Sequence, residues 1–166
     1  MVLRVSDYKI SISLVFVILV VLAFAAGKHV ETMAAILALG VHEFAHVFAG
    51  KKLGIAIDEI EILPFGGRIV SGLNDAPDEK EILMVLAGPL SNFAVAGLIL
   101  FLSTLELMPQ KLAGQLISYQ LMIGVFNMLP AFPLDGGRIF ALWLSQRTSY
   151  TSSVRMASHA GKILAY

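Results

Sequence analysis

The chain contains no cysteine among its 166 residues, which excludes disulfide bridges and thiolate metal ligands. Any metal ion would have to be held by histidine and carboxylate side chains. Charged residues make up only 14% of the chain, whereas they account for about a quarter of an average soluble domain. The formal net charge is zero, and the lack of a basic cluster argues against a nucleic-acid partner.

Hydrophobic residues make up 57% of the chain, and the mean hydropathy is +0.81. They gather into long runs, which predicts an α-helical, multi-pass integral membrane protein. Four transmembrane helices are expected, at about 10–26, 32–50, 80–103 and 112–147, with a truncated fifth helix at 151–166. No internal repeat is visible, so residues 1–166 are expected to form a single membrane-embedded domain.

The first apolar run, 10–26, has a second interpretation. Ala23-Phe24-Ala25 is similar to a signal-peptidase site, so the run could instead be a cleaved signal peptide. A retained helix is favoured because the next apolar run follows after only a few residues.

The second apolar run carries His42, Glu43 and His46 in the HExxH arrangement. Residues four apart lie on one face of a helix, so both imidazoles can bind one metal ion, while the glutamate can reach a water on that ion. Ionisable side chains in hydrocarbon are costly unless they are paired or bind a ligand, and their position therefore indicates a site. The alternative is a chance motif whose polar side chains are satisfied by neighbouring helices.

The fourth apolar run is interrupted between Asn127 and Asp135, where Pro130 and Pro133 cannot continue a regular helix. Irregular backbone at membrane depth is tolerated only where it is buried in protein or lines a cavity. Asp135 is the expected third metal ligand. Two imidazoles and one carboxylate suit a single Zn²⁺ with a fourth position open for water, although such ligands also suit other divalent ions. With Glu43 as general base, the expected reaction is amide hydrolysis.

The distribution of Lys and Arg predicts the orientation in the membrane. With the N-terminus inside, ten of the 12 Lys and Arg residues lie on the inner side, and only Lys28 and Lys111 lie outside. The second and fourth apolar runs then cross the membrane in the same direction. The HExxH residues and Asp135 are therefore expected at similar depth, nearer the cytoplasmic face.

A small membrane-associated β-hairpin or sheet is predicted at about 55–71. Glu59 and Glu61 alternate with Ile60 and Ile62, which is the period of a strand with one wet face. A turn at 64–67 precedes a short return strand. The simplest interpretation of the two glutamates is a solvated strand face.

The third apolar run contains Ala87-Gly88-Pro89 followed by Asn92. Glycine and proline in a membrane helix permit close packing and a kink, and a buried asparagine needs a hydrogen-bond partner. Helix packing and support of the metal site are equal alternatives for these residues.

Together these motifs resemble the site-2 protease family of intramembrane zinc metalloproteases. The resemblance covers about residues 10–147 and rests on HExxH in a membrane helix, Ala87-Gly88-Pro89 with Asn92, and Asn127-x-x-Pro130-x-x-x-x-Asp135-Gly136. Two stretches, Leu63-Pro64-Phe65-Gly66-Gly67 and Phe132-Pro133-Leu134-Asp135-Gly136-Gly137, are similar more narrowly to its sporulation stage IV FB-type branch, which processes a sigma-factor precursor.

The resemblance implies one Zn²⁺ per chain on His42, His46 and Asp135, with acid–base work by Glu43 and with Asn127 near the site. It implies a prokaryotic cell-membrane protease that cleaves a membrane-associated or transmembrane protein, such as a sigma-factor precursor, to release a regulator. Inhibitory or regulatory membrane proteins are further expected partners.

A substrate helix must unwind before hydrolysis, because its amides are engaged in helical hydrogen bonds. An edge strand at 55–70, with Ile60 and Ile62 as candidate contacts, could capture the extended segment by strand addition. The rival function is a non-proteolytic zinc-binding membrane protein, either a transporter or an inactive scaffold. A transporter should show further intramembrane ligands along a path, and an inactive relative would be expected to lose Glu43.

Overall fold

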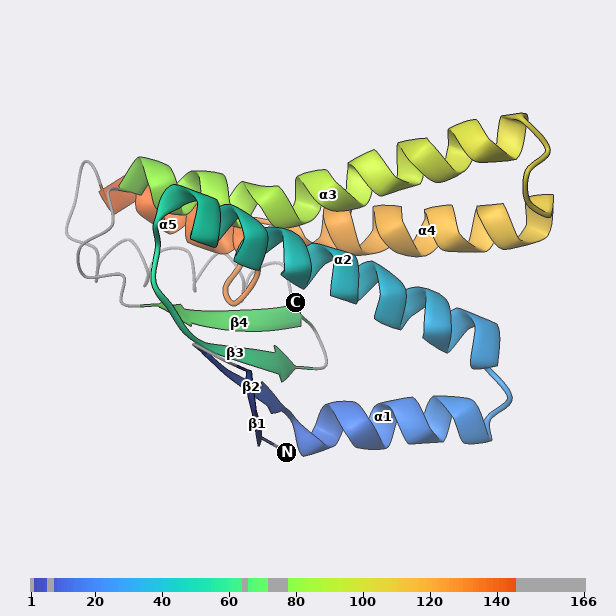
Figure 1. The fold of residues 1–166 in the computed structure, drawn as a ribbon, viewed down its shortest axis with the longest axis horizontal. Helices are drawn as coiled ribbons and strands as arrows, with labels where there is room; N and C mark the ends of the chain where they lie inside the picture. Colours follow the sequence, from blue (N-terminus) through green and yellow to red (C-terminus); the bar gives the residue numbers. More distant parts are fainter. Residues whose placement is uncertain (1, 6–7, 64–65, 72–77, 146–166) are drawn as a thin grey trace.

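The computed structural model describes residues 2–5, 8–63, 66–71 and 78–145, which form five helices and a four-stranded sheet (Figure 1). The strands are β1 (Val2–Val5), β2 (Tyr8–Ile12), β3 (Ile57–Leu63) and β4 (Gly66–Ser71). The helices are α1 (Leu14–Ala25), α2 (His29–Leu53), α3 (Asp78–Thr104), α4 (Gln110–Asn127) and α5 (Asp135–Ser145).

Helix α3 packs against α2, α4 and α5 and forms the centre of the helical layer. Small side chains, Ala34, Ala38, Ala96 and Ala113 among them, are buried where these helices meet. Large apolar side chains point outward on the same helices, and they include Leu37, Phe44, Leu90, Leu98 and Phe101. Small residues at helix contacts and large apolar residues outside are typical of helices packed within a bilayer.

Among the described residues, α2 and α3 are the two helices long and apolar enough to cross a membrane. Helix α1 is apolar but has 12 residues, or about 18 Å at 1.5 Å per residue, against a hydrocarbon core of about 30 Å. Helix α4 has 18 residues, and polar side chains such as Lys111, Gln115 and Gln120 lower its hydropathy. The prediction of four spans is therefore not confirmed, and the predicted helix at 151–166 lies outside the described residues.

The predicted first helix, 10–26, is wrong at its start. Ile10, Ser11 and Ile12 belong to β2 and pair in parallel with Ile60, Glu61 and Ile62 of β3. The alternation of isoleucine with a polar residue is a strand pattern, and it was hidden by the apolar run that follows. The predicted break in the fourth run is confirmed, since α4 ends at Asn127 and α5 begins at Asp135.

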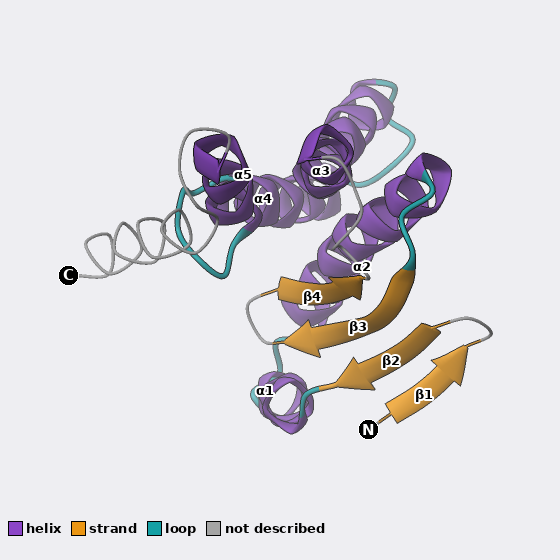
Figure 2. Ribbon diagram, turned by 90° about the vertical axis from the view of Figure 1, so that its left-hand side faces the viewer, coloured by secondary structure: helices purple, strands orange, loops and turns teal. Residues whose placement is uncertain are grey.

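The sheet has the order β1-β2-β3-β4, with β1 and β4 at its edges. The predicted hairpin at about 55–71 is confirmed by the antiparallel pairing of β3 with β4, whereas β1 and β2 were not predicted. Figure 2 shows β4 as the strand nearest to α2 and β1 as the strand farthest from it. The sheet therefore offers its β4 edge to the helix that carries HExxH.

Two small apolar clusters attach the sheet and its connections to the helices. Val47 of α2 packs with Ile57 and Ile60 of β3. Ile55, in the link between α2 and β3, packs with Met84 and Val85 of α3. These contacts fix β3, and through it β4, beside the second half of α2.

Candidate metal centre

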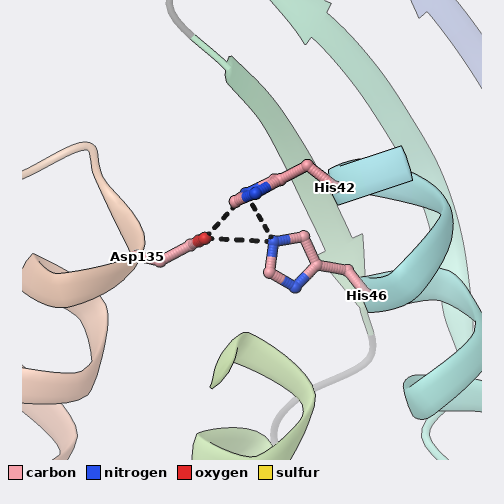
Figure 3. A group of neighbouring side chains, drawn as sticks. All are labelled: His42, His46 and Asp135. Atoms are coloured by element: carbon pink, nitrogen blue, oxygen red, sulfur yellow. Dashed lines mark hydrogen bonds and ion pairs between the residues drawn. The ribbon is translucent and has the colours of Figure 1, made fainter. Parts of the chain in front are cut away.

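His42 and His46 of α2 meet Asp135, the first residue of α5, in the interior of the helical layer (Figure 3). The two Nε2 atoms are 3.1 Å apart, and Asp135 Oδ2 lies 2.9 Å from Nε2 of His42 and 3.1 Å from Nε2 of His46. All three side chains are buried. The structure thus brings together the three residues that the sequence predicted as metal ligands.

Nδ1, the ring nitrogen of each histidine that faces away from Asp135, lies against a hydrogen-bond acceptor. Nδ1 of His46 lies 2.9 Å from the carbonyl oxygen of Met84, so this nitrogen must carry the hydrogen. Nδ1 of His42 lies 2.7 Å from Oδ1 of Asn92, whose amide nitrogen donates to the carbonyl oxygen of Ala38. In its neutral form, each histidine is therefore the tautomer that leaves Nε2 without a hydrogen and facing Asp135.

These tautomers give an arrangement that fits a cation. In these neutral tautomers, two Nε2 lone pairs and a carboxylate oxygen of Asp135 face one another at 2.9–3.1 Å without a hydrogen between them, and three acceptors at such distances repel. A divalent ion among them removes that repulsion. The donor set of two imidazoles and one carboxylate matches zinc sites that keep a position open for water. His42, His46 and Asp135 would hold the ion.

Glu43 lies next to this cluster under the backbone of β4. Its Oε1 accepts a hydrogen bond of 2.6 Å from the Gly67 N–H. Its Oε2 is buried and has no hydrogen-bond partner among the described residues. A buried carboxylate oxygen without a hydrogen-bond partner is costly, and Oε2 is thus an acceptor that the described residues leave unsatisfied.

Gly88 of α3 explains the Ala87-Gly88-Pro89 motif. A Cβ at this position would collide with the imidazole of His46 and would lie 2.9 Å from Cε1 of His42. Only glycine lets α3 come close enough to support both rings. Asn92, one turn further along α3, then reaches His42.

The two glycines after Asp135 are required by a close backbone approach. A Cβ on Gly136 would run into the backbone of Met128 and Leu129, and one on Gly137 would lie 2.5 Å from the carbonyl carbon of Ala131. The irregular segment between α4 and α5 thus folds tightly against the start of α5.

An ion pair holds α5 to α3 one turn after Asp135. Arg138 Nη2 donates to Oε1 of Glu81 at 3.0 Å, and both side chains are largely buried. Because Asp135 is in the first turn of α5, this ion pair fixes the helix that presents the carboxylate.

The remaining predicted site residues lie elsewhere. Asn127 is buried at the end of α4, donates to the carbonyl oxygen of Ile123, and borders a cavity of about 700 Å³ between α1, α2 and α4. Ile60 is buried in the cluster with Val47. Ile62 is half-buried and pairs with Gly67. Since β3 has strands on both sides, the expectation of an edge strand at Ile60 and Ile62 is corrected: the edge is β4.

Four contributors were not predicted from the sequence: Gly67 as a donor to Glu43, Gln120 as a partner of Asn92, and the pair Glu81 and Arg138. A glutamine within an apolar run was the one visible signal for Gln120. The others depend on contacts between segments far apart in the sequence, which no local pattern reveals.

Comparison with known proteins decides the family. Residues 31–115 and 103–165 match the family model described as Peptidase family M50. The chain belongs to peptidase family M50. The structure titled Site-2 Protease from Methanocaldococcus jannaschii matches with a TM-score of 0.83 at 29% identity, over 99% of this chain and 81% of that one. The predicted site-2 protease resemblance is confirmed for this M50 chain.

Curated relatives of this M50 chain agree with that assignment. Zinc metalloprotease MJ0392 of Methanocaldococcus jannaschii is 38% identical over 128 residues, which are 75% of this chain and 37% of that protein. Stage IV sporulation protein FB of Bacillus subtilis is 26% identical over 140 residues, or 84% of this chain and 49% of that protein. The M50 chain thus spans between a third and a half of the length of these relatives.

Proposed function

We propose that this chain is the catalytic part of an intramembrane zinc endopeptidase that hydrolyses a peptide bond in or near a membrane-associated segment of its substrate. One observation carries the proposal: the three converging acceptors of His42, His46 and Asp135 lie beside Glu43, whose second carboxylate oxygen is unpaired. Metal ligands with a general base beside them are what metal-assisted amide hydrolysis requires.

Each residue then has a defined task. When bound, zinc supplies Lewis-acid activation of the attacking water and of the scissile carbonyl. Glu43 accepts the proton of that water at Oε2 and returns it to the leaving amine. The Gly67 N–H holds the other oxygen, Oε1, so that the carboxylate keeps one orientation. Asn92 and the Met84 carbonyl hold the two imidazoles with Nε2 toward the metal position.

The edge of β4 supports capture of an extended substrate. The Gly67 N–H donates to Glu43 and so points away from β3, toward α2. N–H groups at every second residue point to the same side of a strand, so the Ile69 N–H faces the open edge as well. A substrate segment added to β4 would lie beside the general base, with its amides freed from helical hydrogen bonds.

The proposal extends to the substrate class, to the orientation of the protein in the membrane and to the extent of the catalytic domain. A membrane-associated or transmembrane protein is the proposed substrate, and a sigma-factor precursor is one such protein, given the similarity to stage IV sporulation protein FB. Residues 1–166 are proposed to act as one metalloprotease domain with the site nearer the cytoplasmic face. Lys51 and Lys52 at the end of α2 support that orientation.

The test measures zinc and cleavage together in the full-length protein in detergent. We expect one zinc per chain in wild type and in Glu43→Gln, and loss of zinc in His46→Ala and Asp135→Ala with an unchanged elution volume in size exclusion. Cleavage of transmembrane-segment peptides, followed by mass spectrometry, should occur in wild type alone. Zinc binding without cleavage by wild type would favour the transporter or scaffold, and folded wild type without zinc would overturn the proposal.

A further inference from the structure

Gln120 of α4 lies at the end of a buried hydrogen-bond chain that leads to the metal position. Its Oε1 accepts a hydrogen bond of 2.5 Å from the amide nitrogen of Asn92, whose oxygen lies 2.7 Å from Nδ1 of His42. The exposed fractions are 5% for Gln120, 0% for Asn92 and 1% for His42. This series of hydrogen bonds thus runs from α4 through α3 to α2, and all of its side chains are buried.

Close packing of α3 and α4 makes this contact. Gly124 lies one turn after Gln120, and a Cβ there would lie 3.2 Å from the Cβ of Asn92 and 2.9 Å from the ring of Phe93. A larger residue at 124 would push α4 away. The glycine therefore allows a glutamine of α4 to reach an asparagine of α3.

The donors and acceptors in this series of hydrogen bonds can be assigned from the partners of Asn92. Asn92 has two amide hydrogens, one donated to the Ala38 carbonyl at 3.0 Å and one to Gln120. With both donors engaged, only Oδ1 of Asn92 is left for His42, and it accepts from Nδ1–H. Without the acceptor on Gln120, one amide hydrogen of Asn92 would be buried without a partner. The hydrogen bond that stabilises this orientation of the amide would then be lost.

We propose that Gln120 is a positioning residue of the metal centre, acting through Asn92 to hold His42 in the tautomer that presents Nε2 to the metal. This inference rests on the proposed zinc site. Groups that orient a metal-binding histidine typically change metal affinity by 10–100-fold when they are lost. Asn92 contacts His42 directly, and Gln120 acts one hydrogen bond further away, through Asn92. Gln120 thereby links the metal centre to α4, which supplies none of the three predicted ligands.

The variants separate an acceptor role from a packing role. Gln120→Glu keeps an acceptor oxygen in either protonation state, whereas Gln120→Met keeps the volume and removes the acceptor. We expect Gln120→Met to weaken zinc binding by roughly tenfold, and Gln120→Glu to stay near wild type. If Gln120 only filled space, the order would be reversed, because a buried apolar side chain is tolerated better than a carboxylate. Gln115→Met, on the same helix and half-buried, is the matched control.

A double substitution tests whether the effect passes through Asn92. Asn92→Leu should weaken zinc binding at least as much as Gln120→Met does. The Gln120→Met change should then add nothing in the Asn92→Leu background, because the group through which it acts is gone. Independent, multiplying losses would show that Gln120 acts by another route and would overturn the proposal.

A readout without zinc separates this inference from the proposed function. In metal-free full-length protein, ¹⁵N NMR of the histidine rings should show His42 protonated at Nδ1, with a shift toward the Nε2-protonated form in Gln120→Met and not in Gln115→Met. An unchanged tautomer together with unchanged zinc affinity in Gln120→Met would refute the positioning role. Absence of zinc binding by wild type would instead refute the proposed function and leave the NMR result to decide the role of Gln120.

Discussion

Gly67 shows how a single missing side chain supports the site. Its N–H holds Oε1 of Glu43 at 2.6 Å, and a Cβ at this position would overlap the Glu43 carboxylate. We therefore expect Gly67→Ala to displace the carboxylate and to lower the rate of peptide cleavage by about 100-fold or more, the usual contribution of a general base. Zinc content should stay at the wild-type value, because the change does not touch the histidines or Asp135.

The matched control for Gly67→Ala is Gly40→Ala in α2. A Cβ on Gly40 meets nothing within 4 Å, so cleavage should be unaffected. The variants are compared by single-turnover cleavage and by zinc content of the same samples. Wild-type cleavage by Gly67→Ala would show that the Gly67 contact does not orient the general base.

The convergence of the three candidate metal ligands could be predicted at the residue scale, because helical periodicity and side-chain chemistry determine it. His42 and His46 are four residues apart on one helix, and Asp135 was the carboxylate at the break after α4. The hydrogen-bond partners of these residues were harder to predict from the sequence. Asn92 had two equal interpretations until its oxygen was found 2.7 Å from His42, and the contact of Gly67 with Glu43 spans 24 residues. Such contacts depend on tertiary packing, which no local pattern contains.

At the scale of elements, prolines and strand alternation were reliable signals, and the lengths of apolar runs were not. The break between α4 and α5 and the hairpin of β3 with β4 were both predicted. Strand β2 was missed because its five residues lead directly into α1, and β1 because four residues carry little periodic signal. These two strands place β3 inside the sheet, which moves the open edge to β4.

The open edge of β4 yields a prediction for the element as a whole. Proline removes a backbone N–H, and an edge strand tolerates it where that N–H points outward. The Ile69→Pro variant should therefore leave the sheet intact and remove one hydrogen bond to an added substrate strand. We expect a several-fold loss of kcat/KM on transmembrane-segment peptides, dominated by a higher KM, with zinc content unchanged.

Val70→Pro is the comparison variant for this edge. Val70 pairs with Glu59, and alternation turns its N–H toward β3, so the substitution should destabilise the sheet and lower the thermal midpoint. Ile69→Pro should leave that midpoint close to wild type. Unchanged KM in Ile69→Pro would argue that substrates do not add to the outer edge of β4.

At the scale of the whole molecule, the elements that surround the candidate metal centre lie at one end. The sheet, α5, the C-terminal end of α2 and the start of α3 lie together, whereas the α1–α2 and α3–α4 connections lie at the opposite end (Figure 1). Lys51 and Lys52 are at the first end, and Lys28 and Lys111 are at the second. The apolar runs and the positions of Lys and Arg predicted a membrane protein with this charge bias. They did not predict how many helices span the membrane, because α1 is short and α4 carries polar residues.

The lack of cysteine makes the proposed orientation directly measurable, since any introduced thiol is unique in the chain. Lys52 and Lys111 are both exposed. Lys52 is near the end of α2 and Lys111 near the start of α4, and these two helix ends lie at opposite ends of the molecule (Figure 1). With the metal centre nearer the cytoplasm, a membrane-impermeant maleimide should label Lys111→Cys in intact cells and Lys52→Cys only after permeabilisation. Both variants should keep wild-type zinc content, which shows that the labelled protein is folded. Labelling of Lys52→Cys in intact cells, with Lys111→Cys protected, would place the β4 edge and its substrate on the outer side instead.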